Sequence, residues 1–176
     1  LCTLAGKSRL AVWIGGAPKL WQILFYYGIL AGVLILGHYI GKAEKKFPGK
    51  KQKIQIRTQR YCCLAAVFFT GTAVGILGYH PAGSLKITCL DVGQGDGIVV
   101  ETPDDQHILI DGGSSSRSSL ARYCLMPYLK NQGISYVDMV IISHTDLDHI
   151  SGTEELFTYI SQGLTSIRVG SLILPG

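Results

Sequence analysis

The sequence has few cysteines and methionines, and neither residue type forms a recognisable motif. Its 176 residues include five cysteines and two methionines. No C-x-x-C pair occurs, so the spacing typical of cysteine-based zinc sites and thioredoxin-like redox motifs is missing. No Ser/His/Asp triad or catalytic cysteine arrangement competes for a hydrolytic role either. The first methionine is Met126, and Gly176 comes directly after an expected strand, so we expect an internal piece of a longer protein.

Formal charge is absent from two long runs. Leu20–Ile40 is a run of 21 residues without a formal charge, and Cys62–Tyr79 is a run of 18. At 1.5 Å of rise per residue, a helix of either length covers about the ~30 Å hydrocarbon core of a bilayer. The mean hydropathy of +0.29 is high for a soluble domain. We therefore expect two transmembrane helices, at residues 20–40 and 61–79. The alternative is two buried helices of a large soluble protein.

The segment between the two runs is strongly basic. Residues 41–60 contain eight lysines and arginines against one acid, Glu44. A nucleic-acid-binding patch is one interpretation, but the position between two spans favours a positive-inside, cytoplasmic loop. Residues 1–19 then become an extracytoplasmic lead-in, 80–84 a linker, and 81–176 an extracytoplasmic domain. That last part has five basic and eleven acidic residues, which argues against a basic DNA-binding face on it.

Alternating apolar residues and turn signals predict the elements of the C-terminal part. A meander of three strands is expected first, followed by helices that alternate with strands. This order is typical of an α/β layered sandwich, of which the segment is too short to form the whole. The expected strands are 85–90, 97–101, 107–110, 137–143 and 167–174; one helix follows Ser119 and runs to Gln132, and another starts at Thr153-Glu154-Glu155.

A cluster of metal-ligating residue types follows the apolar run Met139–Ile142. It reads His144-Thr-Asp146-Leu-Asp148-His149. Imidazole and carboxylate ligands suit zinc, manganese or iron, and an open position on such an ion activates water. The alternative is an ordinary loop rich in turn-forming residues. A second apolar run ends in Asp111-Gly112-Gly113, and two strands ending this way favour a site at one sheet edge.

Asp91-Val-Gly-Gln94-Gly-Asp96 is a further acidic, glycine-rich segment. Glycine and aspartate are the residues expected in a hairpin turn, and on that ground alone the turn is the favoured interpretation. Its place beside the candidate site keeps a functional role open.

Taken together and in this order, Leu90–Asp96, Ile108–Gly113 and Ile142–His149 carry a specific resemblance. They resemble the metallo-β-lactamase-like domain of the ComEC-type DNA-internalization competence proteins, over about residues 85–152. The resemblance implies an αββα sandwich, with residues 85–176 as its N-terminal half. The two apolar runs and their basic loop are similar to the end of that family's membrane channel.

The resemblance also implies a function. The chain would belong to a multi-pass protein of the cytoplasmic membrane that passes one strand of transforming DNA inward. The outer domain of that protein would be a metal-dependent nuclease that degrades the other strand. Implied partners are DNA, the lipid membrane, other competence-machinery proteins and further copies of the chain as a homo-oligomer. Two alternatives stay open: a catalytically degenerate domain that guides DNA, and an outward-facing hydrolase of small phosphoesters or lactones.

Residue roles follow from the same resemblance. Asp148 would both bind metal and serve as the catalytic base, and Asp111 would brace the metal loop. Asp146 stands where the wider superfamily has a histidine, and this harder ligand leaves the choice between zinc and manganese open. Further ligands are expected beyond Gly176, so this chain alone should be inactive. The implied metal ligands are His144, Asp146, Asp148 and His149, and the mouth of the site is Asp91, Gln94 and Asp96.

Overall fold

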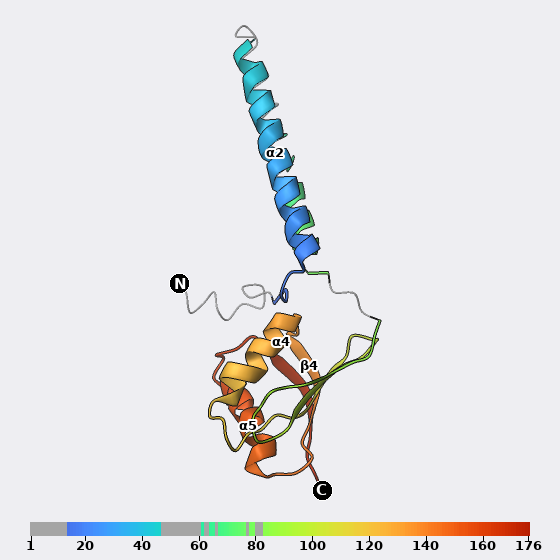
Figure 1. Ribbon diagram of the computed structural model, residues 1–176, viewed down its shortest axis with the longest axis vertical. Helices are drawn as coiled ribbons and strands as arrows, with labels where there is room; N and C mark the ends of the chain where they lie inside the picture. The colour runs from blue at the N-terminus through green and yellow to red at the C-terminus, as the bar shows by residue number, and fades with distance from the viewer. Residues whose placement is uncertain (1–13, 47–60, 62–63, 66, 77, 80–82) are drawn as a thin grey trace. The chain divides into compact units, whose positions relative to one another are not determined.

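The computed structural model describes residues 14–46, 61, 64–65, 67–76, 78–79 and 83–176 (Figure 1). The chain forms two compact units. One comprises Pro18–Tyr79, and the other contains the remaining described residues. The two units are treated separately below.

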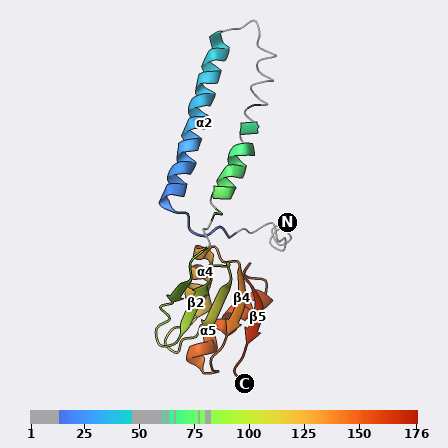
Figure 2. The same ribbon diagram turned by 90° about the vertical axis from the view of Figure 1, so that its right-hand side faces the viewer.

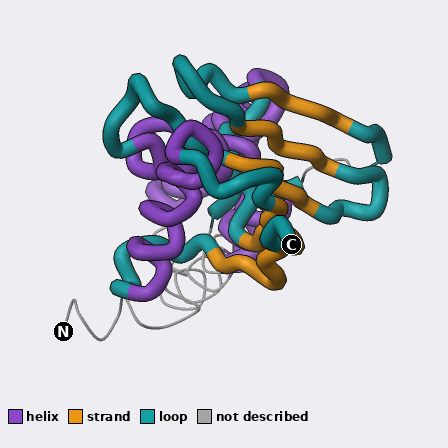
Figure 3. Tube along the Cα trace, turned by 90° about the horizontal axis from the view of Figure 1, so that it is seen from below, coloured by secondary structure: helices purple, strands orange, loops and turns teal. Residues whose placement is uncertain are grey.

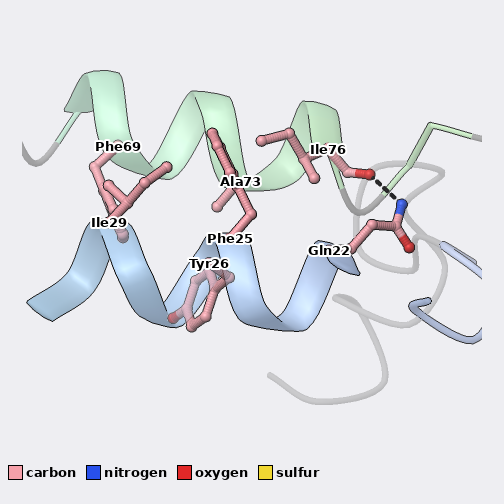
Figure 4. Close-up of a pocket in the computed structure, with 7 residues that line it drawn as sticks. All are labelled: Gln22, Phe25, Tyr26, Ile29, Phe69, Ala73 and Ile76. Atoms are coloured by element: carbon pink, nitrogen blue, oxygen red, sulfur yellow. Dashed lines mark hydrogen bonds between the residues drawn. The ribbon is translucent and has the colours of Figure 1, made fainter. Parts of the chain in front are cut away.

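The first unit consists of two helical segments that lie side by side (Figure 2). Helix α2 spans Leu20–Lys46, and the second segment is helical at residues 61, 64–65 and 67–76. Gln22 is 3% exposed, and its amide nitrogen donates to the Ile76 carbonyl at 2.6 Å (Figure 4). Its Oε1 accepts the backbone N–H of Lys19 at 2.6 Å. One side chain therefore satisfies backbone groups at the start of α2 and at the end of the second helical segment.

Large apolar side chains are exposed along both helical segments, including Leu24, Leu34, Val67 and Phe68. Among the described residues, however, no helix has the length and apolar character needed to cross a membrane. The transmembrane helices predicted at 20–40 and 61–79 are therefore not confirmed. Helix α2 also continues six residues past the predicted end at Ile40, to Lys46. The rest of the basic loop, residues 47–60, lies outside the described part of the chain.

The second unit is built on one mixed sheet with the strand order β1-β2-β3-β4-β5. Strands β1 to β3 pair antiparallel, and β3, β4 and β5 pair parallel. The predicted three-strand meander and the α/β class are thus confirmed. The elements are β1 Lys86–Cys89, β2 Gly97–Glu101, β3 His107–Asp111, the π-helical turn η2 Ala121–Leu125, α4 Met126–Gln132, β4 Tyr136–Ile141, α5 Leu147–Ser161 and β5 Arg168–Ile173.

The helices η2, α4 and α5 gather on one side of the sheet (Figure 3). The core lies between these two layers. Val99, Leu109 and Val140 are neighbours across β2, β3 and β4 and are at most 1% exposed. Leu125 of η2 and Leu156 of α5 are buried in the same cluster. Burial of these aliphatic side chains positions the strand ends that carry the candidate site.

The opposite face of the sheet is apolar as well, but it is only partly buried. Ile98, Ile110, Ile141 and Ile173 are paired in one row across the strands. The first three have intermediate exposure, and Ile173 is 45% exposed. A strand that is apolar on both faces is typical of a sheet covered on both sides. Within the described residues, only the helix-bearing face has a covering layer.

The predicted start of the last helix at Thr153 is wrong, because α5 begins at Leu147. Asp146 has the extended backbone of an N-cap residue, and its carbonyl accepts the N–H groups of His149 and Ile150. Gly152 lies within the helix. A Cβ at this position would approach the backbone carbonyl of Gly112, so glycine permits α5 to pack closely on the end of β3.

Candidate metal site

The site is built where β3 and β4 end, because these strands are parallel and their carboxyl ends meet at one edge of the sheet. Asp111 is the last residue of β3 and is 5% exposed. Its Oδ1 accepts the backbone N–H of Ser143 at 2.7 Å, and its Oδ2 accepts the Ser143 hydroxyl at 2.8 Å. Asp111 thus ties the end of β3 to the residue that precedes His144.

Asp111 also contacts the first turns of α5. Its Oδ2 lies 3.2 Å from Nδ1 of His149, and its carbonyl accepts the Thr153 hydroxyl at 2.9 Å. Burial by itself would raise the pKa of Asp111, but hydrogen bonds from Ser143 and His149 hold that pKa below its usual value. This carboxyl group is therefore ionised at neutral pH. Its two hydrogen bonds to Ser143 hold the start of the motif loop against the end of β3.

In His149 the pKa is shifted in the opposite direction, upward. Its ring is 11% exposed, and burial by itself would lower its pKa. The carboxylates of Asp111, Asp148 and Asp96 raise the pKa of His149 above its usual value. Three carboxylates around one imidazole favour a cation at this point, whether that cation is a proton or a metal ion.

The other residues of the motif lie around the two histidine rings. The ring centroids of His144 and His149 are 3.5 Å apart. Nε2 of His144 lies 3.7 Å from Oδ2 of Asp146, and Nε2 of His149 lies 3.7 Å from Oδ2 of Asp148. Each imidazole therefore has its Nε2 beside one carboxylate of the motif.

Two groups of ligand-type atoms result. His144, Asp148 and His149 each offer an atom within 4.8 Å of the others, and so do Asp96, Asp111 and His149. Imidazole nitrogen and carboxylate oxygen form a donor set that fits a divalent ion such as zinc or manganese. Asp146 belongs to neither group. It is exposed, and its Oδ2 lies 3.7 Å from Nε2 of His144.

The Asp91–Asp96 segment is divided between two environments. Asp96 faces the site, with Oδ2 at 3.6 Å from Nδ1 of His149. Asp91 instead pairs with Arg117, whose two terminal nitrogens donate to the carbonyl and the carboxylate of Asp91 at 2.8 and 2.9 Å. Gln94 is exposed, and its backbone bonds to the serine-rich loop through Ser115 and Ser116. The segment joins the antiparallel strands β1 and β2, as the hairpin-turn interpretation predicts, and this connection is also anchored to Arg117 and to the serine-rich loop.

Backbone groups lock this loop against α5. The N–H of Asp96 donates to the Asp148 carbonyl at 3.1 Å, and the carbonyl of Asp96 accepts the N–H groups of Gly112 and Gly113. A Cβ at Gly95 would collide with the carbonyls of Gly113 and Asp148, and Gly95 has a φ of +154°. Only glycine fits this close approach of three chain segments.

A cleft of about 440 Å³ borders the motif. One wall is the loop of residues 114–120, with Arg117, and the other is the face of α5 formed by Leu147, Ser151 and Glu155. The Ser151 hydroxyl accepts the Ser114 N–H at 2.9 Å and fixes the loop to α5. Sequence reasoning did not select Ser143, Thr153 or Ser151. An isolated serine or threonine carries no signal until its partner is known.

Comparisons with known proteins find one matching family and two similar proteins. Residues 90–161 match the model of the metallo-β-lactamase superfamily. The chain is 34% identical over 119 residues to "ComE operon protein 3" of Bacillus subtilis (strain 168), covering 59% of this chain and 14% of that protein. It is 38% identical over 72 residues to "Recombination protein 2" of Haemophilus influenzae, covering 40% of this chain and 9% of that protein.

No solved structure matches the chain at a significant level. The chain spans less than a sixth of the length of each relative. All three motifs from the sequence analysis lie within the superfamily match, at residues 90–161. The comparisons therefore confirm the resemblance drawn from those motifs, to a ComEC-type competence protein with a metallo-β-lactamase superfamily domain.

Proposed function

We propose that the sheet unit is part of a metal-dependent phosphodiesterase domain that acts on DNA, within a membrane protein of natural competence. The observation that carries the proposal is the cluster of His144, Asp148 and His149, three ligand-type side chains within 4.8 Å of one another. Both imidazoles lie at the end of β4 and the start of α5, which the buried Asp111 ties to β3. This is the arrangement expected of a pre-formed cation site supported by outer hydrogen bonds.

His144, Asp148 and His149 would hold a zinc or manganese ion, and Asp146 and Asp96 would complete its surroundings. The donor chemistry fits either ion, since nitrogen and oxygen ligands are both present. When bound, such an ion lowers the pKa of a water molecule and offsets negative charge on a phosphate. The domain has more acids than bases, so the metal would also supply the attraction for a polyanion.

Asp148 is the residue proposed as the base. It lies in the first turn of α5 and is intermediate in exposure, so one carboxylate oxygen can face solvent while Oδ2 faces His149 at 3.7 Å. It can orient a water molecule and accept its proton at the carboxylate. His149 would not take this role with a metal bound, because its Nε2 lone pair would then be a ligand of the ion. Asp146, at the N-cap position, is exposed and would assist only from the rim.

We further propose that residues 20–40 and 61–79 lie in the membrane, with 41–60 in the cytoplasm and 81–176 outside. Support comes from the charge asymmetry of the sequence and from the apolar side chains exposed on both helical segments. The partly exposed isoleucine row on the open sheet face supports the proposed αββα sandwich. In that architecture a second sheet covers this face.

DNA cleavage by the full-length protein tests the catalytic proposal. Purified protein loaded with manganese or zinc should cleave linear DNA, and Asp148→Asn should lower the rate by roughly a hundredfold or more, because a general base is lost. Asp104→Asn is the matched control. It changes an exposed carboxylate in the turn between β2 and β3, at the other end of β3 from the site, and should leave the rate unchanged.

Two results would replace the proposal with a specific alternative. If the loaded wild type does not cleave DNA and Asp148→Asn cells transform normally, the domain guides DNA without cutting it. If small phosphoesters or lactones are hydrolysed and DNA is not, the site belongs to a small-molecule hydrolase.

A further inference from the structure

The hydroxyl of Ser143 contacts three side chains of the candidate site, those of Asp111, His144 and His149. Its hydroxyl donates to Oδ2 of Asp111 at 2.8 Å and lies 3.0 Å from Nδ1 of His144. The same oxygen is 3.5 Å from Nδ1 of His149. The proposed function gives this residue no role, and a hydroxyl so placed must satisfy partners of opposite polarity.

Counting protons fixes the direction of each hydrogen bond. A hydroxyl has one proton, and an ionised carboxylate can only accept, so the Ser143 proton goes to Asp111. Toward His144 the hydroxyl oxygen has only lone pairs left to offer. Nδ1 of His144 must then carry the hydrogen, and in a neutral imidazole the lone pair is left on Nε2.

The same carboxylate acts directly on the second ring. Nδ1 of His149 lies 3.2 Å from Oδ2 of Asp111, so it donates there and its lone pair is likewise on Nε2. The two Nε2 atoms are those that lie 3.7 Å from Asp146 and from Asp148. Both lone pairs therefore face the carboxylates of the motif, where a cation would be bound.

We propose that Ser143 is a positioning residue that transmits the orientation set by Asp111 to His144, holding this ring as the Nδ1–H tautomer with Nε2 free for a metal. One buried carboxylate thus sets both imidazoles, one directly and one through a hydroxyl. A partner of this kind fixes the tautomer of a ligand before the metal arrives. The inference rests on the metal-binding part of the proposed function, but its first test needs no metal.

The first test is nitrogen NMR of the metal-free, 176-residue chain labelled with ¹⁵N-histidine, at about pH 9, above the ordinary histidine pKa. His144→Gln and His149→Gln identify the signals. In the wild type, His144 should show a protonated Nδ1 and a lone pair on Nε2. Ser143→Ala should move His144 toward the Nε2–H form, and Ser143→Thr, which keeps the hydroxyl, should restore the wild-type pattern.

Thr153→Val is the control for a merely structural effect. It removes a hydrogen bond to the backbone carbonyl of Asp111 without touching the carboxylate, so the His144 tautomer should not change. An Nε2–H tautomer at His144 in the wild type would overturn the inference. So would an unchanged tautomer in Ser143→Ala, or an equal shift in Thr153→Val.

Metal affinity is the second readout, measured by titrating the full-length protein and the same variants of it with zinc and with manganese. Ser143→Ala should weaken binding by about 10–100-fold, the usual effect of losing a hydrogen-bond partner of a metal ligand, and Ser143→Thr should restore it. Equal affinity in Ser143→Ala and the wild type would overturn the inference. A wild type that binds neither metal would instead refute the metal site, while the NMR result still decides the role of Ser143.

Discussion

Asp111 and His149 are 38 positions apart in the chain, yet Oδ2 of the first lies 3.2 Å from Nδ1 of the second in a buried environment. This contact joins the last residue of β3 to the first turn of α5. It couples the stability of the sheet unit to the geometry of the candidate site, because the same carboxylate also holds Ser143.

Asp111→Asn should therefore destabilise the sheet unit by about 2 kcal/mol, since hydrogen bonds to a buried charged group are replaced by weaker neutral ones. Urea unfolding followed by circular dichroism measures this. Asp91→Asn is the matched control, because its pair with Arg117 involves a carboxylate that is 83% exposed. It should cost less than about 1 kcal/mol. Equal losses in the two variants would contradict the bracing role of Asp111.

The stability of the metal-free chain should depend on pH through the same pair. The pKa of folded Asp111 is lowered, so its contribution is present above its ordinary value of 3.8 and is lost as pH falls through the folded pKa. The pKa of folded His149 is raised, so its contribution is full below 6.5 and is lost as pH rises through the folded pKa. These two groups therefore favour maximum stability between about pH 3.8 and pH 6.5.

His149→Gln isolates the upper limb of this profile. The variant should lack the part of the decline above pH 6.5 that the wild type owes to His149, because glutamine does not titrate. Denaturation midpoints measured in steps of pH check this. Identical slopes for variant and wild type on the alkaline side would show that the ring is not held by its carboxylates.

His149→Ala should lower the metal affinity of the full-length protein by at least about tenfold, because a bound ion loses a ligand and the remaining site compensates its desolvation poorly. Elemental analysis after equilibrium dialysis measures the bound metal. His107→Ala provides the comparison, since His107 lies at the start of β3 and belongs to neither ligand group. Unchanged stoichiometry in His149→Ala would count decisively against the site.

The proposed topology predicts which positions can be labelled in intact cells. In a protein whose native cysteines are replaced by serine, Ser115→Cys should react with an impermeant thiol reagent, and Lys50→Cys should react only after the membrane is opened. The reason is the concentration of basic residues at 41–60. The reverse labelling pattern would invert the proposed orientation.

The strands of the sheet unit were predictable because their alternating apolar residues and flanking glycines are local signals. The pattern predicts the strand at 97–101 with the bounds of β2, and the other four strands within one or two residues at each end. The start of α5 was missed because Thr153-Glu154-Glu155 is a stronger local start signal than Asp146. The close packing of Gly152 against Gly112 within this helix is a tertiary contact, which no local pattern indicates.

The chemistry of the site was predictable only in part, for a similar reason. Histidine and aspartate residues can be selected as candidate ligands from their type and spacing in the sequence. The structure brings five of the selected residues together: His144, Asp148, His149, Asp111 and Asp96. Asp91 looks equivalent to Asp96 in the sequence, yet it pairs with Arg117, which is 26 positions away. The hydroxyl groups of Ser143 and Thr153 act through Asp111, and no local pattern indicates that partnership.

The close approach at Gly95 and Gly113 has a consequence for how this domain tolerates mutation. Both residues lack a functional group, but a Cβ on either would strike the backbone of Asp148 or His149. In a saturation mutagenesis screen, alanine at these two positions should therefore be as damaging as loss of a ligand, whereas the exposed Gln94 next to Gly95 should accept many residues. At these two positions the tolerance to substitution is therefore set by the space between neighbouring main-chain segments.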